Sequence, residues 1–121
     1  MDVGVVGVGA MGKNHARVYS ELKQVDSLYV YDLNSKMAET VAEKTEAECL
    51  SSMDEMLKKV DALSLCVPTP YHFDTAKKVL EAGVNVLIEK PICLTASDAE
   101  ELMHYIPEGV TVGIGHIERF N

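Results

Sequence analysis

The first twelve residues constrain the fold of this chain more than any other stretch. Segment 2–6, Asp-Val-Gly-Val-Val, has the apolar composition of a buried strand and leads into Gly7, Gly9 and Gly12 at the spacing G-x-G-x-x-G. The first glycine permits a tight turn, the second lets a pyrophosphate approach the backbone, and the third lets a following helix pack closely on the strand. The N-terminus of that helix would point its free N–H groups at the phosphates.

An acidic residue follows this turn at the distance that a dinucleotide site requires. Asp32 comes about twenty residues after Gly12, directly after the apolar run 27–31. A carboxylate at this position can accept hydrogen bonds from both hydroxyls of an adenosine ribose. It would also repel a 2′-phosphate, so NAD is favoured over NADP, although Lys36 nearby would partly offset that repulsion. The turn and the acid together predict a dinucleotide-binding fold.

Strand-like and helix-like patterns alternate along the rest of the chain. Apolar runs typical of strands are followed by capping residues and by apolar positions at helical spacing. With right-handed crossovers, this order predicts an α/β fold: a doubly wound parallel sheet of about six strands with helices on both faces, the Rossmann fold. The expected strands cover 2–6, 27–32, 47–50, 61–67, 84–89 and 110–114. The expected helices start after Gly12, at Asn34 or Ser35, at Ser51 or Ser52, at Tyr71 and at the capping box 95–98.

The helix after the glycine turn carries a histidine on its apolar face. Met11, His15, Val18 and Leu22 recur at the spacing of one helix face, which predicts that all four point inward. For His15 we expect a histidine at the edge of the core, bonded to a backbone carbonyl, ahead of the alternative of a cofactor contact.

Composition excludes several other classes of protein. The chain has 121 residues, enough for one domain with a real core, and a formal charge of −8. That charge argues against binding to nucleic acid or to a membrane surface, which requires clustered basic residues. Three cysteines without a C-x-x-C pair indicate neither a disulfide framework nor a zinc site, so no metal is expected and a cytoplasmic location fits.

Three further segments carry a resemblance to a known family. Pro-Thr-x-x-His at 68–72, Glu-Lys-Pro at 89–91 and Gly-His-Ile-Glu-Arg-Phe-Asn at 115–121 accompany the opening Gly-Val-Gly-Ala-Met-Gly-x-x-His. Together they resemble the glucose–fructose oxidoreductase / inositol dehydrogenase / MocA family of nicotinamide oxidoreductases. Among the members of this family, the UDP-N-acetylglucosamine 3-dehydrogenases have motifs that are similar to these. The resemblance covers essentially the whole chain.

The resemblance implies a role for individual residues. Lys90 would lie beside the nicotinamide and bond the substrate hydroxyl that is oxidised, which makes it the expected catalytic residue. Glu89 would bind the nicotinamide ribose, and His72 would either contact the ligand or brace its loop. The full set of expected cofactor-binding residues is Gly7, Val8, Gly9, Ala10, Met11, Gly12, Asp32, Val67, Pro68, Thr69, His72, Glu89 and Lys90.

Domain organisation is expected to follow the same family. Residues 1–121 would form the dinucleotide-binding domain, and the family's C-terminal substrate domain would be absent from this chain, which alone would bind cofactor without turnover. The parent would be a homo-oligomeric NAD-dependent oxidoreductase acting on a sugar, sugar nucleotide or polyol. The alternative is a non-enzymatic dinucleotide sensor or scaffold, against which the Glu-Lys-Pro segment argues. A generic nucleotide or S-adenosylmethionine domain is a weaker alternative.

Overall fold

A six-stranded parallel sheet forms the centre of the computed structural model, which describes residues 1–67, 72–88, 100–101 and 104–114. The spatial order of its strands is β3-β2-β1-β4-β5-β6, and every pair is parallel. The strands are β1 (Asp2–Val6), β2 (Ser27–Tyr31), β3 (Glu48–Cys49), β4 (Ala62–Leu65), β5 (Asn85–Ile88) and β6 (Val112–Ile114). The predicted doubly wound Rossmann sheet is confirmed.

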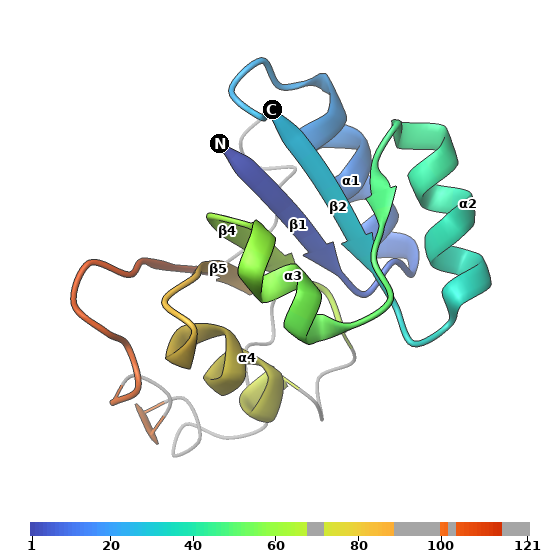
Figure 1. Ribbon diagram of the computed structural model, residues 1–121. Helices are drawn as coiled ribbons and strands as arrows, with labels where there is room; N and C mark the ends of the chain where they lie inside the picture. Colours follow the sequence, from blue (N-terminus) through green and yellow to red (C-terminus); the bar gives the residue numbers. More distant parts are fainter. Residues whose placement is uncertain (68–71, 89–99, 102–103, 115–121) are drawn as a thin grey trace.

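Helices cover both faces of this sheet (Figure 1). The helices α1 (Ala10–Glu21) and α2 (Ser35–Thr45) pack on one face, where Ala16 and Val41 share a buried cluster with Val5 and Val30 of the strands. The helices α3 (Met53–Lys59) and α4 (His72–Glu81) pack on the other face. The buried residues of that second cluster are Val6, Leu50, Met56, Val60, Leu63, Leu65, Ala76, Val79, Leu80, Val84, Val86 and Ile88.

Local capping chemistry explains where the helices begin and end. The Asn34 side chain accepts a hydrogen bond from the Met37 N–H at 3.2 Å, and Ser52 accepts one from the Glu55 N–H at 3.1 Å. Each side chain therefore caps its helix, α2 and α3 respectively, as its residue type predicts. After α4, Gly83 adopts a φ of +77°, which a glycine accepts without steric strain.

Several expected elements differ from the structure in extent. Helix α1 ends at Glu21, so Leu22 is its C-cap with 43% of its surface exposed, and the prediction that Leu22 faces inward is wrong. The periodic spacing of apolar residues does not show where a helix ends, and α1 ends one residue before Leu22, the next position of its inward face. The strand expected over 47–50 is only the two-residue β3. The capping box 95–98 lies outside the described residues.

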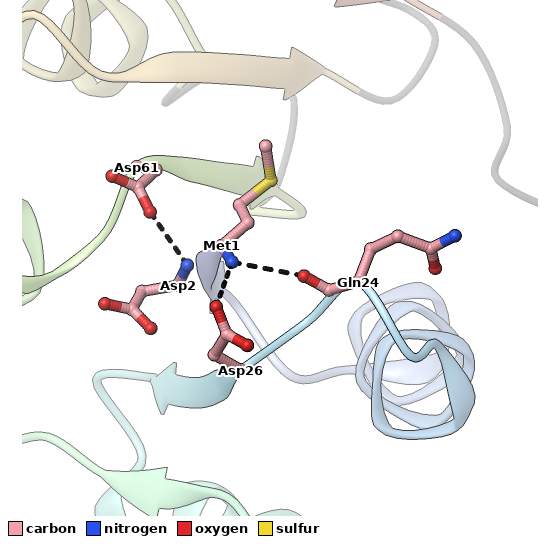
Figure 2. A network of polar contacts seen from close by, with 5 residues as sticks. All are labelled: Met1, Asp2, Gln24, Asp26 and Asp61. Carbon is pink, nitrogen blue, oxygen red and sulfur yellow. Dashed lines mark hydrogen bonds and ion pairs between the residues drawn. The ribbon is translucent and has the colours of Figure 1, made fainter.

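Carboxylates anchor the N-terminal ends of the central strands (Figure 2). The Met1 amino group donates to the Asp26 carboxylate and, at 3.1 Å, to the Gln24 carbonyl, while the Asp2 N–H donates to Asp61 Oδ2 at 2.8 Å. The hydrogen bond to Asp26 raises the pKa of the Met1 amino group. These contacts join the start of β1 to the segments that enter β2 and β4.

From β1, the strands β2 and β3 are added on one side of the sheet, and the strands β4, β5 and β6 are added on the other side. The direction in which successive strands are added therefore reverses between β1 and β4. In open α/β sheets, ligands bind at such a switch point, outside the carboxyl ends of the strands. No helix within the described residues is long and apolar enough to cross a bilayer.

Candidate dinucleotide site

The glycine turn lies at this switch point, between the ends of β2 and β4. Gly7 has a φ of +90°, and its N–H donates to the Tyr31 carbonyl at 2.9 Å. A Cβ built on Gly7 would lie 2.8 Å from the carbonyl carbon and oxygen of Cys66. Two features therefore require glycine at this position: the positive φ of the backbone and the short distance to the Cys66 backbone, which directly follows β4.

The other two glycines of the turn differ in how closely they are packed, since Gly12 is crowded and Gly9 is open. A Cβ on Gly12 would lie 1.8 Å from the Gly7 carbonyl oxygen, so Gly12 is where α1 packs directly on the turn. Apart from its two chain neighbours, none of the described residues has an atom within 4 Å of a Cβ built on Gly9. The space over Gly9 is open, as the approach of a pyrophosphate to the backbone requires.

Helix α1 begins at this turn without a side-chain cap. Its N-cap is Gly9, and its first turn contains no acidic residue. The N–H groups of Ala10, Met11 and Gly12 have no partner within the helix, because the first intrahelical hydrogen bond comes from the Lys13 N–H to the Gly9 carbonyl at 2.9 Å. Together with the positive end of the helix dipole, these donors fit the phosphates of a dinucleotide.

Asp32 connects the glycine turn to the start of α2. Its Oδ2 accepts a hydrogen bond from the Val8 N–H at 2.8 Å, and its Oδ1 accepts one from the Asn34 N–H at 2.7 Å. The side chain is half-buried at the end of β2. Each carboxylate oxygen can accept a further hydrogen bond, so Asp32 retains the capacity to bind ribose hydroxyls. Its hydrogen bond to the turn was not predicted, because only the folded sheet brings the ends of β1 and β2 together.

His15 belongs to a buried polar group that sequence reasoning located only in part. It is fully buried, and its Nδ1 lies 2.8 Å from Ser64 Oγ. Ser64 is also fully buried, and its Oγ lies 2.5 Å from the Tyr19 hydroxyl. These contacts join α1 to β4 beside the switch point. His15 is thus inside the core rather than at its edge. The sequence feature that could have indicated its partner is Ser64, a single hydroxyl residue within an apolar strand.

Replacing Ser64 by alanine is expected to lower the free energy of unfolding by about 1–3 kcal/mol, because His15 and Tyr19 both lose their hydrogen bond to the buried Ser64 hydroxyl. Urea denaturation measures the change. Ser51→Ala is the matched control, since its hydroxyl is exposed and its contact to Glu55 is long, at 3.3 Å, so a change within about 0.5 kcal/mol is expected there. Equal effects for the two variants would contradict a structural role of the buried group.

The remaining predicted residues follow the neighbouring strands β4 and β5. Val67 is half-buried just after β4, and His72 is the first residue of α4. Pro68, Thr69, Glu89 and Lys90 lie outside the described residues. Leu65 and Ile88 are paired in register, so β4 and β5 end at the same edge of the sheet as the glycine turn.

The glycine turn, the uncapped start of α1 and Asp32 at the switch point define a dinucleotide-binding Rossmann domain. Residues 1–116 match the family described as "Oxidoreductase family, NAD-binding Rossmann fold". The chain belongs to this family, the glucose–fructose oxidoreductase / inositol dehydrogenase / MocA oxidoreductases, which confirms the resemblance seen in its motifs.

Individual relatives agree with this assignment. The UDP-N-acetylglucosamine 3-dehydrogenase of Acidithiobacillus ferrooxidans is 38% identical over 120 residues, which are 98% of this chain and 38% of that protein. Its crystal structure superposes with a TM-score of 0.89 over 98% of this chain and 39% of that one. The structure of GenD2 from gentamicin A biosynthesis, in complex with NAD, is 33% identical with a TM-score of 0.89, covering 95% of this chain and 34% of that one. The chain therefore spans about two fifths or less of the length of these relatives.

Proposed function

We propose that this chain is the cofactor-binding domain of an NAD-dependent oxidoreductase that acts on a hydroxyl group of a sugar, sugar nucleotide or polyol. The observation that carries the proposal is the open backbone over Gly9 at the uncapped start of α1, with Asp32 hydrogen-bonded to the same turn. Family membership supports the reaction class, and the names of the relatives support the substrate class. Because this chain spans 38% of the length of its dehydrogenase relative, we further propose that residues 1–121 are one domain and that substrate is bound by a second.

Each residue of the site has a distinct proposed role. The glycine turn and the first N–H groups of α1 bind the pyrophosphate, with Val8, Ala10 and Met11 lining the turn, and Asp32 accepts hydrogen bonds from the adenosine ribose. The residues proposed for the nicotinamide half are Val67, Pro68, Thr69, His72, Glu89 and Lys90. Bound NAD supplies a hydride acceptor for the carbon that carries the hydroxyl. The residues of this chain bind and orient the cofactor and accept the proton of the hydroxyl group.

Lys90 is the proposed catalytic residue because it follows β5, whose end lies at the cofactor edge of the sheet. In its neutral amine form, the Lys90 side chain would accept the proton of the hydroxyl group as that group is oxidised. The ammonium group that forms would stabilise negative charge on the oxygen and would then pass the proton on. In the full-length protein, Lys90→Met is expected to lower kcat for UDP-sugar oxidation by about 10²–10⁴-fold while NADH still binds. Steady-state kinetics and a parallel NADH titration measure both quantities.

The control for this experiment is Lys23→Met, which changes an exposed lysine of the connection between α1 and β2 and should leave kcat unchanged. A Lys90→Met variant with near-parental kcat would refute the catalytic role. If the parent protein bound NADH and turned over no sugar-type substrate, the result would instead favour the non-enzymatic dinucleotide sensor or scaffold.

We also propose a cytoplasmic, homo-oligomeric parent protein that binds neither nucleic acid nor membrane. Three cysteines without a C-x-x-C pair suit a reducing compartment, and the net charge of −8 disfavours polyanionic partners. The oligomeric state rests on the family resemblance, and light scattering of the full-length protein tests it.

A further inference from the structure

The buried polar group of His15, Ser64 and Tyr19 joins α1 to β4 inside the core. His15 Nδ1 lies 2.8 Å from Ser64 Oγ, and the same oxygen lies 2.5 Å from the Tyr19 hydroxyl. His15 and Tyr19 are one turn apart on α1, and their rings meet edge to face with centroids 6.2 Å apart. Two successive turns of the helix are therefore joined to one residue of the strand.

The apolar packing of α1 is directed away from β4. Ala16 of this helix lies in a buried cluster whose other described members come from β1, β2, α2 and the glycine turn, and none of these members comes from β4. Apolar contacts are non-directional, so they do not set the distance between α1 and β4. A hydrogen bond does set it, because its donor and acceptor must lie about 2.7–3.2 Å apart. The polar group therefore fixes how far α1 lies from β4.

The distance between α1 and β4 extends to the dinucleotide site. Ser64 comes one residue before the end of β4, and Cys66 follows it on the same face of the sheet. A Cβ built on Gly12 would lie 3.5 Å from the Cys66 Cβ. The spacing that His15 sets therefore continues to the place where the start of α1 faces the end of β4, between the pyrophosphate and the nicotinamide half of the cofactor.

We propose that His15 and Ser64 are positioning residues, which hold the phosphate-binding start of α1 at the distance from the end of β4 that the nicotinamide half of the cofactor requires. The inference rests on the dinucleotide site proposed above and deepens it. Both side chains are fully buried, so they act through the helix and the strand that bear them. The adenosine half depends instead on the glycine turn, the first N–H groups of α1 and Asp32, which are joined to β1 and β2.

NADH and ADP separate the two halves of the site, because ADP has the adenosine and the two phosphates but no nicotinamide riboside. His15→Leu and Ser64→Ala each remove the hydrogen bond between α1 and β4. In calorimetric titration of this chain, each variant should weaken NADH binding about five- to tenfold, the value of one hydrogen bond, and change ADP binding by less than about twofold. Circular dichroism at the titration temperature verifies folding, and either folded variant suffices for the comparison.

Two further results separate positioning from a merely structural role. In His15→Asn, the side-chain amide takes the place of Nδ1 and can bond the Ser64 hydroxyl, so NADH affinity should return to within about threefold of the parent. The double variant His15→Leu/Ser64→Ala should bind NADH no more than about twofold more weakly than either single variant, because both changes remove the same hydrogen bond.

The matched control is Val60→Ala, which weakens the buried cluster on the other face of the sheet without changing α1. Its ratio of NADH affinity to ADP affinity should equal that of the parent. The inference would be wrong, while the dinucleotide site stood, if His15→Leu and Ser64→Ala kept the parental ratio or if His15→Asn bound NADH no better than His15→Leu. If the parent chain bound neither NADH nor ADP, the dinucleotide site and the inference that rests on it would both fail.

Discussion

Replacement of Gly12 by alanine is expected to prevent stable folding of this domain or to lower its free energy of unfolding by about 3 kcal/mol or more. The new Cβ would lie 1.8 Å from the Gly7 carbonyl oxygen and 2.7 Å from its carbonyl carbon. Both atoms are backbone and cannot move aside as a flexible side chain would. Helix α1 would have to move away from the sheet, which would open the core around Ala16. Urea denaturation followed by circular dichroism measures the loss.

Gly9→Ala is the matched variant for this experiment, because no described residue other than its chain neighbours has an atom within 4 Å of the new Cβ. The backbone of Gly9 is extended at φ −67° and ψ −161°, which alanine also adopts. Its stability should stay within about 1 kcal/mol of the parent, the ordinary cost of alanine at an N-cap. NADH binding should weaken at least about tenfold, since the methyl group would occupy the path of the pyrophosphate. Parental stability for Gly12→Ala, or parental NADH affinity for Gly9→Ala, would contradict these separate roles.

Replacement of Asp32 by alanine is expected to weaken NADH binding roughly ten- to hundredfold, because hydrogen bonds to a charged acceptor are lost from the ribose. The same change should lower the free energy of unfolding by about 1–3 kcal/mol, since the Val8 and Asn34 N–H groups lose their acceptor. Calorimetric titration and urea denaturation measure the two effects.

Asp32→Asn separates these two contributions. The amide keeps one acceptor oxygen for a backbone N–H, so its loss of stability should be smaller than that of the alanine variant. Its NADH affinity should still fall, because the negative charge is gone. An asparagine variant that bound NADH as tightly as the parent would show that the carboxylate does not bind the ribose.

The features that the sequence predicted correctly depend on residues close together in the chain. The spacing of Gly7, Gly9 and Gly12, the capping residues Asn34 and Ser52, and the apolar runs of the strands all act within one or two turns of backbone. The alternation of these elements, with right-handed crossovers, leaves few ways to arrange the sheet. For this reason the fold class and the location of the glycine turn could be predicted without tertiary information.

Contacts between distant residues could not be predicted in the same way. Ser64 accompanies His15 and Tyr19 only because β4 lies next to β1 under α1. The inward position expected of Leu22 failed because the helix ends at Glu21, and periodicity does not reveal where a chain leaves its sheet.

The sequence by itself determined that this chain forms a dinucleotide-binding Rossmann domain, because the glycine turn and Asp32 have few other physical uses at that spacing. Tertiary structure alone decided what surrounds that turn. It joined Asp32 to the Val8 N–H, left open space over Gly9, and brought Lys13 of α1 and Lys36 of α2 to one pocket. The physical reason is that parallel strands end at one edge of the sheet, so residues from separate βα units meet there only after the sheet has formed.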